Sequence, residues 1–483
     1  MEKTYKLYIN GQFVEGAADP FDVFNPATGE KITTIRGATA DQAQEALEAA
    51  QEAFKTWSYA SLTERTQWMY KLRDACAARK DELVDLLARE SGKSYGVCSS
   101  ELDRFYDYFG YYAEEALRVN DVGIQDYNSH RDRFYRVMMR PLGVVVAHLP
   151  WNAPVLFIAA KLCPAMASGC TIVIKPSSST PLSAIRIAEI ASEIGMPAGV
   201  FNVVAGKASV VGNYLSASKI PAMVTVVGST ATGLEVMNQM ASSIKKSSLE
   251  LGGNAPCIIM PDADPDVVSS YIINNKTHNS GQACANVNRI FVHEDIHDAF
   301  IEQLVGKLKK VKIGWGKDMP TALSSLIDIP SRDRVLGLVQ DSVDHGAKLL
   351  FGGCIPEDLP EHLKKGAFMV PAVLDGVTDD MKVANVEIFG PIYSVLTFRD
   401  LDDVLTRANN TDAGLGSYIF THDNRTIIKA AEVLDFGKVY VNGAPTWTPN
   451  MPHIGIKQSG IGCMFGEWSL REYYRMKLLS VAP

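Results

Sequence analysis

Cys284 is the side chain of this sequence best suited to covalent chemistry. It lies in the segment NSGQACANVN, residues 279–288, among small polar side chains rather than in an apolar run. Gly281 permits an unusual backbone turn just before the thiol. The chain has eight cysteines, and a cysteine is more often a small buried side chain than a nucleophile. A nucleophilic role therefore requires other groups that act on the same carbon atom.

Two further segments supply groups that would assist a thiol nucleophile. Glu250 lies in SSLELGGNAPCII between two leucines, and an apolar setting raises the pKa of a carboxyl group toward that of a general base. Two glycines follow it and allow close approach of the backbone. In PWNAP, Asn152 offers a side-chain amide that could donate to an oxyanion beside the N–H next to Cys284. An ordinary strand-end glutamate is the alternative for Glu250.

The chain also contains loops suited to a dinucleotide. Lys175 ends the apolar run of TIVIKPSSSTP, where its amine could bind ribose or phosphate, although a solvated strand-end lysine fits equally well. GSTATG, residues 228–233, offers backbone N–H groups and a hydroxyl to a phosphate at a helix start. It is not the G-x-G-x-x-G fingerprint and lacks the lysine of a P-loop. The segment VEIFGPI adds Glu387 and Phe389 on a third loop.

Together these groups predict the oxidation of an aldehyde. A thiolate that adds to an aldehyde gives a thiohemiacetal, and a hydride acceptor converts that adduct into a thioester. A thiol, a carboxylate base and a nucleotide-binding sheet therefore indicate a nicotinamide-dependent reaction. The alternative from another class is a cofactor-independent cysteine hydrolase, which needs a histidine beside Cys284. His278 and His293 are nearest in the sequence, and neither lies in a comparable loop.

Composition narrows the class of protein. With 483 residues the chain is too long for one ordinary core, and 47% apolar with 21% charged residues is typical of a globular protein. The net charge of −8 argues against a nucleic-acid-binding surface. The start MEKTYKLYIN lacks a signal-peptide core, no long apolar run occurs, and the cysteines show no C-x-x-C or zinc pattern. We expect a cytoplasmic protein without a membrane or nucleic-acid partner, a metal or a disulfide framework.

The first ninety residues predict a hairpin followed by helices. KLYINGQFVE alternates polar and apolar residues and turns at Asn10-Gly11, a dipeptide typical of hairpins. Thr39 and Gln42 predict a capping box at the start of a helix. The helical pattern continues through residues 63–92 and ends at a glycine.

From about residue 140 the pattern predicts an α/β fold. The apolar runs LGVVVAHLP, CTIVIKPS, GVFNVVAG and AMVTVVGS alternate with longer helical stretches, which is typical of a parallel sheet covered on both faces. A second series after Cys284 contains NRIFVHE, YSVLTFRD, GSYIFTHD and FGKVYVNG. We therefore expect two α/β units that meet near residues 250–260. Such sheets bind ligands at the carboxyl ends of their strands.

PWNAP, KPS, GSTATG, LELGG, GQAC and EIFGP, in this order, resemble the motifs of the aldehyde dehydrogenase superfamily over nearly the whole chain. The resemblance implies a Rossmann-like cofactor domain, an α/β catalytic domain and a small oligomerisation sheet. The expected ranges are 1–118 and 141–252 for the cofactor domain, 253–452 for the catalytic domain, and 119–140 with 453–483 for oligomerisation. DRFYRVMMRPLG and REYYRMKLLSVAP are expected to pair in that sheet within a homodimer or homotetramer, with an edge strand of the monomer as the alternative.

The resemblance also implies a role for each motif residue. Cys284 is similar to the catalytic nucleophile, Glu250 to the base that activates the hydrolytic water, and Asn152 to an oxyanion donor. The implied cofactor contacts are Lys175 on the adenosine ribose, Ser229 on a phosphate, Glu387 on the nicotinamide ribose, Phe389 near the nicotinamide ring, and Trp151 and Gly228 along the site. The implied reaction passes through a thiohemiacetal and a thioester. Glu250 favours the hydrolytic branch of the family over the coenzyme A-acylating branch, because hydrolysis needs a base.

Two departures from the family pattern matter. Many NAD-preferring members carry a glutamate directly after KPS, where this chain has Ser178. Loss of that carboxylate removes repulsion of a 2′-phosphate, so the cofactor is expected to be NAD or NADP. Asn286 and Asn288 beside the nucleophile match no subfamily pattern. A non-catalytic structural relative would be expected to lack Cys284 or Glu250, and both are present.

The substrate prediction rests on the loop before the C-terminus. Members that act on short semialdehydes often hold a distal carboxylate with an arginine or lysine, and residues 441–455 contain neither, only Trp447 and His453. Trp447 could stack on an aromatic substrate. Phe109 and Tyr112 in YFGYYAEEALR could add to such a site, with burial in a helix core as the alternative. We expect an aromatic or broad preference; the alternative is a lactaldehyde or succinate-semialdehyde type, which FDVFNPATGE and QSGIG resemble.

Overall fold

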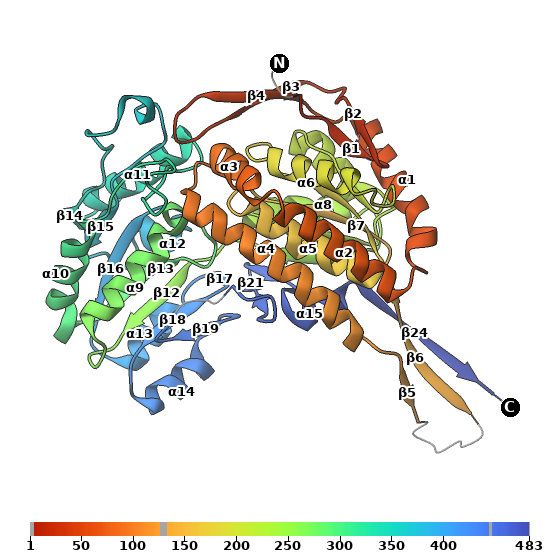
Figure 1. Cartoon of the computed structure of the whole chain (residues 1–483). Coiled ribbons are helices and arrows are strands. Elements are labelled where there is room, and N and C mark those ends of the chain that lie inside the picture. The colour runs from red at the N-terminus through yellow and green to blue at the C-terminus, as the bar shows by residue number, and fades with distance from the viewer. Residues whose placement is uncertain (1–3, 126–132, 444–446, 483) are drawn as a thin grey trace.

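The apolar runs that follow residue 140 form the centre of an eight-stranded sheet. The five central strands are parallel, and helices cover both faces of the sheet (Figure 1), so all but the start of the last strand is buried. In spatial order they are β9 (Phe201–Val203), β8 (Thr171–Lys175), β7 (Val144–His148), β10 (Met223–Val227) and β11 (Lys246–Glu250). The edges are antiparallel and consist of β1 (Leu7–Ile9), β2 (Gln12–Val14) and β22 (Gly460–Ile461).

The second series of apolar runs forms a separate seven-stranded sheet. Six of its strands are parallel, and β14 pairs antiparallel at one edge. In spatial order the strands are β14 (Lys348–Phe351), β15 (Ala372–Asp375), β16 (Ile392–Phe398), β13 (Val287–His293), β12 (Ala255–Ile259), β18 (Ser417–Phe420) and β19 (Val439–Val441). The chain passes from the first sheet to the second between β11 and β12. The exact domain boundaries stay a prediction.

The computed structural model describes residues 4–125, 133–443 and 447–482. Around the first sheet lie α1 (Ala40–Trp57), α2 (Leu62–Ala77), α3 (Lys80–Ser91), α4 (Tyr95–Glu115), α5 (Pro154–Ser168), α6 (Leu182–Glu193), α7 (Asn213–Ala217), α8 (Thr230–Met240) and α15 (Gly466–Glu472). Around the second lie α9 (Pro265–Thr277), α10 (His297–Leu308), α11 (Ile329–Asp344), α12 (Lys382–Asn385), α13 (Leu401–Asn409) and α14 (Asn424–Val433). Small ribbons complete the fold: β3 (Pro20–Phe24) with β4 (Lys31–Arg36), β17 (Ala413–Gly414) with β21 (Ile456–Lys457), and β20 (His453–Ile454) with β23 (Cys463–Met464). In the described ranges, no helix is long and apolar enough to cross a membrane, and no group of three potential metal-binding side chains occurs.

The local predictions for the N-terminal region are largely confirmed. Asn10 and Gly11 take positive φ values of 52° and 77° at the tip of the β1–β2 hairpin. The capping box of α1 is present, since Thr39 Oγ1 accepts from the Gln42 N–H and the Gln42 side chain accepts from the Thr39 N–H. Residues 63–92 form two helices rather than one, since α2 ends at Ala77 and α3 begins at Lys80.

A three-stranded sheet projects from the body near the C-terminus (Figure 1). It consists of β24 (Tyr474–Val481), β6 (Phe134–Pro141) and β5 (Val122–Ile124), in that order. The predicted pairing of the two extended segments is thus confirmed over eight residue pairs. Met476 and Leu478 on the outer strand are 77% and 59% exposed, which suits contact with another copy. Assembly through this sheet stays a prediction that light scattering would test. The range 453–483 also supplies β22 to the first sheet, a part that the expected oligomerisation role does not include.

Candidate active site

The motif residues converge on one cavity of about 580 Å³, between the carboxyl ends of the first sheet and the amino ends of the second. The site residues that line it, all expected from the sequence, are Trp151, Asn152, Lys175, Ser178, Gly228, Ser229, Glu250, Cys284, Glu387 and Phe389. A second cavity of about 330 Å³ shares Asn152 and Cys284 with the first. The thiol and the amide therefore lie where two cavities meet, and the volumes of both are in the range of small-molecule sites.

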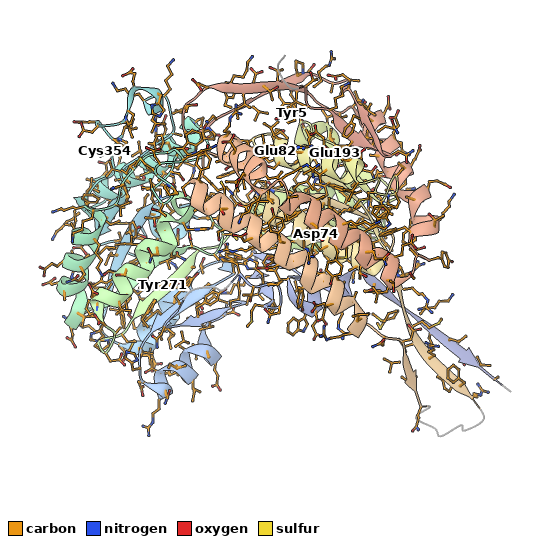
Figure 2. The ribbon with its side chains drawn as sticks, in the orientation of Figure 1. Tyr5, Asp74, Glu82, Glu193, Tyr271 and Cys354 are labelled. Carbon is orange, nitrogen blue, oxygen red and sulfur yellow. The ribbon has the colours of Figure 1, made fainter. Side chains whose placement is uncertain are left out.

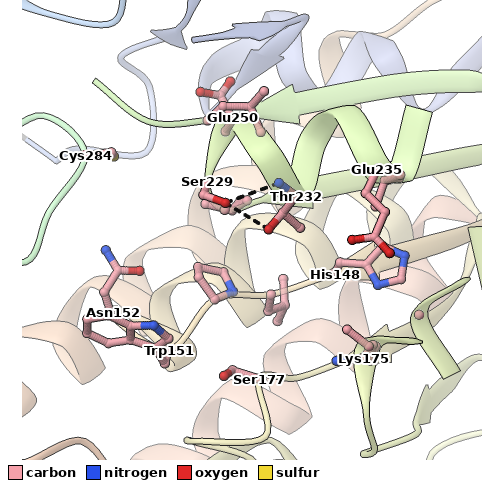
Figure 3. Close-up of a pocket in the computed structure, with 18 of the residues that line it drawn as sticks. His148, Trp151, Asn152, Lys175, Ser177, Ser229, Thr232, Glu235, Glu250 and Cys284 are labelled. Atoms are coloured by element: carbon pink, nitrogen blue, oxygen red, sulfur yellow. Dashed lines mark hydrogen bonds between the residues drawn. The ribbon is translucent and has the colours of Figure 1, made fainter. Parts of the chain in front are cut away.

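Lys175 lies at the far end of the first cavity, at the carboxyl end of β8. Figure 3 shows it near His148 and Glu235, away from Cys284 and Asn152. Burial lowers the pKa of the Lys175 amine to about 8, and within the described residues the amine donates only to the Pro176 carbonyl, at 3.3 Å. A buried amine with one long hydrogen bond can still donate to hydroxyl or phosphate oxygens of a ligand.

Ser229 begins helix α8 at the same cavity. Its hydroxyl is the N-cap and accepts from the Thr232 N–H at 3.2 Å (Figure 3). The N-terminus of α8 carries the positive end of the helix dipole and free backbone N–H groups, which favour a phosphate. Ser178 lies on the cavity wall, and its hydroxyl donates to the Gly206 carbonyl at 3.2 Å.

Glu387, Phe389 and Trp151 enclose the near end of the cavity. Glu387 Oε1 accepts from the Gly253 N–H at 3.1 Å, and burial raises the pKa of this carboxyl to about 7. Phe389 packs edge to face on Trp151, with ring centroids 5.4 Å apart. Phe389 has a φ of 49°, a left-handed conformation that costs about 1–3 kcal/mol for a residue with a side chain. The backbone is thus strained where it presents this ring.

A buried ion pair holds the loop that carries Asn152. Lys93, before α4, pairs with Glu101 of α4, and the two side chains are 1% and 5% exposed. Lys93 Nζ also donates to the Asn152 carbonyl at 3.0 Å, and Glu101 Oε1 accepts from the Val155 and Leu156 N–H groups at the start of α5. The pair therefore fixes both the loop and the helix that follows it.

Glu250 ends β11 with both carboxylate oxygens buried. Neither oxygen has a hydrogen-bond partner in the described part of the chain. Burial raises the pKa of the Glu250 carboxyl to about 8, and Lys161 of α5 opposes this rise most strongly. The oxygens thus keep their lone pairs for a molecule that enters the cavity, as a general base requires.

An unusual turn precedes Cys284. Asn279, Ser280 and Gly281 all have positive φ values, between 52° and 76°. A side chain on Gly281 would meet the Gly390 carbonyl oxygen at 2.4 Å, and one on Gly253 would meet the Cys284 carbonyl oxygen at 2.3 Å. Glycine is therefore required at both positions, because the backbone comes this close to the cysteine.

His453 and Lys438 were not expected beside Cys284. His453 Nε2 lies 3.9 Å from Cys284 Sγ and 3.8 Å from Glu250 Oε2. Lys438 Nζ lies 2.7 Å from His453 Nδ1. The expectation that no histidine approaches the thiol was wrong, since it considered only histidines near Cys284 in the sequence. Neither residue lies in a family motif quoted above, so only the folded chain brings them to the site.

The second cavity contains Trp447, as expected for a substrate contact, and also Arg104 of α4. The prediction that Phe109 and Tyr112 contribute to the substrate site was wrong. Both side chains are fully buried in the core and line neither of these two cavities. They occupy the face of α4 that packs inward, whereas Arg104 lies on a different face of the same helix. No side chain in the described ranges forms an ion pair or hydrogen bond with Arg104. Its proximity contributes to lowering the pKa of His278, to about 4, although burial is the main cause.

The remaining cysteines show why Cys284 differs. Cys354 is exposed on the outer part of the second half (Figure 2), away from both cavities. The other six are buried: Cys76, Cys98, Cys163, Cys170, Cys257 and Cys463. The prior expectation of a small buried side chain thus holds for these six. Cys284 alone among the eight lines the cavities.

Comparisons with known proteins give one family. A model of the aldehyde dehydrogenase family matches residues 13–479. The NADP+-dependent succinate-semialdehyde dehydrogenase of Escherichia coli is 34% identical over 474 residues, covering 98% of this chain and 97% of the relative. The structure of a lactaldehyde dehydrogenase from Escherichia coli is 35% identical, with a TM-score of 0.95 and 99% of each chain covered. The structure of a betaine aldehyde dehydrogenase from Staphylococcus aureus in complex with NAD+ is 30% identical, with a TM-score of 0.94, and the match covers 99% of this chain and 95% of the other.

We predict that Lys93→Met lowers the free energy of unfolding by roughly 3–5 kcal/mol, because it leaves the Glu101 carboxylate buried without its cation. Urea-induced unfolding measures the loss. Lys80→Met is the matched control: the Lys80–Asp103 ion pair joins α3 to α4, but its side chains are 32% and 58% exposed. That pair should contribute about 0–1 kcal/mol. Equal losses in the two variants would contradict the positioning role of Lys93.

Proposed function

Because the chain belongs to the aldehyde dehydrogenase family, we propose that Cys284, Glu250 and Asn152 perform its catalytic chemistry. The family assignment confirms the resemblance and the fold class expected from the motifs. The chain oxidises an aldehyde with NAD+ or NADP+. The observation that carries the residue assignment is the position of Cys284 and Asn152 on the walls of both cavities, where an aldehyde in one would meet a dinucleotide in the other.

The first half of the reaction uses the thiol and the amide. The Cys284 thiolate forms a bond to the carbonyl carbon, and the carbonyl electron pair moves to the oxygen. The Asn152 amide and the Cys284 N–H donate to that oxyanion. A bound nicotinamide would supply the acceptor for the hydride of this carbon, so that Cys284 would keep the acyl group as a thioester. Lys175, the N-terminus of α8 and Glu387 would hold the dinucleotide along the first cavity.

The second half of the reaction uses Glu250. Its carboxylate takes a proton from a water molecule, and the resulting hydroxide oxygen bonds to the thioester carbon. The carbon–sulfur bond breaks, the carboxylic acid is released, and Cys284 leaves as a thiolate. The two oxygens of Glu250 support this role, since no hydrogen bond within the described residues occupies them.

We predict that Glu250→Gln still releases one reduced nicotinamide per site in a burst but turns over at least ~100-fold more slowly, because acylation does not need the base. Stopped-flow absorbance measures both phases. In the unchanged protein the hydrolytic rate should rise with pH through about 8, since only the ionised carboxyl group accepts a proton. Cys284→Ala should show no burst. A Glu250→Gln variant with normal turnover would remove Glu250 from the mechanism.

The cofactor preference is proposed to depend on Ser178. A carboxylate at this position would repel a 2′-phosphate, and serine does not. We predict that Ser178→Glu lowers the ratio of kcat/KM for NADP to that for NAD at least ~10-fold, the size expected for two charges a few ångströms apart near a surface. Ser178→Gln is the control of equal size without the charge. If both variants shift the ratio equally, bulk rather than charge decides the preference.

The substrate is proposed to carry a distal anionic group that Arg104 binds. The supporting observation is that the Arg104 guanidinium lies on the wall of the second cavity and has no acidic partner in the described ranges. The same cavity is also lined by Asn274, Asn275, Asn279 and Asn286. The relative from Escherichia coli acts on succinate semialdehyde, which has such a group. This favours the semialdehyde alternative over an aromatic preference, although Trp447 lines the same cavity.

We predict that Arg104→Met raises the KM for succinate semialdehyde at least ~10-fold and leaves that for propanal unchanged, because a charged hydrogen bond contributes about 1.5–3 kcal/mol. Steady-state kinetics with both aldehydes measures the split. Arg104→Lys keeps the charge and should retain part of the discrimination. An equal change for the two substrates would assign Arg104 to structure, and a preference for benzaldehyde in the unchanged protein would restore the aromatic prediction.

Cofactor-independent hydrolysis is the second candidate function. The observation in its favour is the approach of His453 to Cys284, which a cysteine hydrolase also needs. The burst experiment separates the two functions, because a hydrolase turns over an ester without nicotinamide and does not oxidise an aldehyde.

A further inference from the structure

Lys438, His453 and Cys284 form a continuous row of ionisable groups. Lys438 precedes β19, His453 begins β20, and Cys284 precedes β13, so three separate elements meet here. Lys438 Nζ lies 2.7 Å from His453 Nδ1, and His453 Nε2 lies 3.9 Å from Cys284 Sγ. Lys438 Nζ also lies 3.3 Å from His453 Nε2, so the amine is nearer to Nδ1, while Nε2 is the ring nitrogen that faces the thiol.

Burial makes separate ionisation of these groups costly. The side chain of His453 is 4% exposed, and burial together with Lys438 and Lys161 holds the pKa of its ring well below the ordinary value. Burial raises the pKa of the Cys284 thiol to about 12 and lowers that of the Lys438 amine to about 8. Lys438 is the strongest influence that opposes the rise at Cys284. The thiol therefore ionises most readily when a cation forms nearby at the same time.

We propose that Lys438 accepts the proton of the Cys284 thiol through His453, so that the pair reaches its reactive thiolate–ammonium form without a proton from solvent. Before transfer, His453 Nδ1–H faces the neutral amine, and Nε2 faces the thiol. The S–H bond breaks and its proton bonds to Nε2, while the Nδ1 proton passes to Lys438 Nζ. The ring is neutral before and after, with its tautomer exchanged, and no proton enters from solvent. This inference rests on the nucleophilic role proposed for Cys284.

The neighbouring charges assign one lysine to each acidic group. Burial is the largest influence on the pKa of both acids; the charge that matters most after it is Lys161 for Glu250 and Lys438 for Cys284. Glu250 Oε2 lies 3.8 Å from His453 Nε2 and faces the same N–H as the thiolate after transfer. The other ionisable groups that influence the cluster are Glu387, Tyr440, Cys463 and Glu472. Burial raises the pKa values of Cys463 and Tyr440, so both keep their own protons. Lys438 contacts His453 Nδ1 directly, which makes it the acceptor that the geometry offers.

The relay is tested by alkylation of Cys284 in cofactor-free protein, which reports thiolate formation without any turnover. Iodoacetamide is the probe, and mass spectrometry assigns the modified cysteine. In the unchanged protein the rate should rise with pH through the first shared ionisation of the pair, near 8. Lys438→Met should slow alkylation at pH 8 at least ~10-fold, equivalent to one pKa unit. Lys429→Met, which removes a surface lysine of α14 paired with Asp402, should leave the rate unchanged.

A double-mutant cycle distinguishes a relay from independent effects. His453→Phe should slow alkylation as much as Lys438→Met, and the double variant should be no slower than either, because both remove the same path. Additive effects, or a wild-type rate in Lys438→Met, would overturn the relay. Lys438→Gln and His453→Gln provide second variants if the first do not fold. Loss of the burst in Cys284→Ala with normal alkylation in Lys438→Met would refute the relay alone, whereas a normal burst in Cys284→Ala would refute the proposed function.

Discussion

The carboxyl ends of the first parallel sheet and the amino ends of the second must face the same space, and the whole site depends on this constraint. Lys175, Ser229 and Glu250 follow strands of the first sheet, whereas Cys284 and Glu387 precede strands of the second. A parallel sheet opens its ligand crevice at the ends of its strands. The strand β22 returns from the C-terminal region to pair with β11, and it ties the two halves together at Glu250.

Desolvation then decides how the buried groups behave. Glu250, Cys284 and Lys438 all lie where water is largely excluded, so each resists carrying its charge alone. Charges of opposite sign reduce this cost when they form together, which is why a lysine faces each acid. The same low dielectric strengthens hydrogen bonds from the Asn152 amide to a developing oxyanion. One physical cause thus raises the basicity of Glu250 and makes the nucleophile depend on its neighbours.

Residues at strand ends could be predicted from the sequence because each lies in a local pattern: an apolar run, then glycine, proline or serine, then a helix. The motif residues that end or follow strands of the first sheet line the cavity for this reason, whereas Cys284, Glu387 and Phe389 precede strands of the second sheet and were expected from the family motifs. Arg104, Lys438 and His453 could not be found in this way, since each reaches the site from an element with no such pattern. The prediction that Phe109 and Tyr112 line the substrate site failed for a related reason. Helical periodicity shows that α4 has a buried face, but not which of its other faces meets the cavity.

The strained backbone around the nucleophile explains why the cavities can share it. Asn279, Ser280 and Gly281 all adopt left-handed conformations, and Gly390 approaches within a distance that only glycine at 281 permits. This turn carries Cys284 between the cavities instead of leaving it on the face of one sheet. Phe389, which lines the first cavity, also has a left-handed backbone conformation, at a similar conformational cost. Strain of this kind persists only where surrounding contacts maintain it, and here the Asn279 amide donates to the Asn152 carbonyl at 3.0 Å. The turn that carries the thiol and the loop that carries the oxyanion donor therefore hold each other in place.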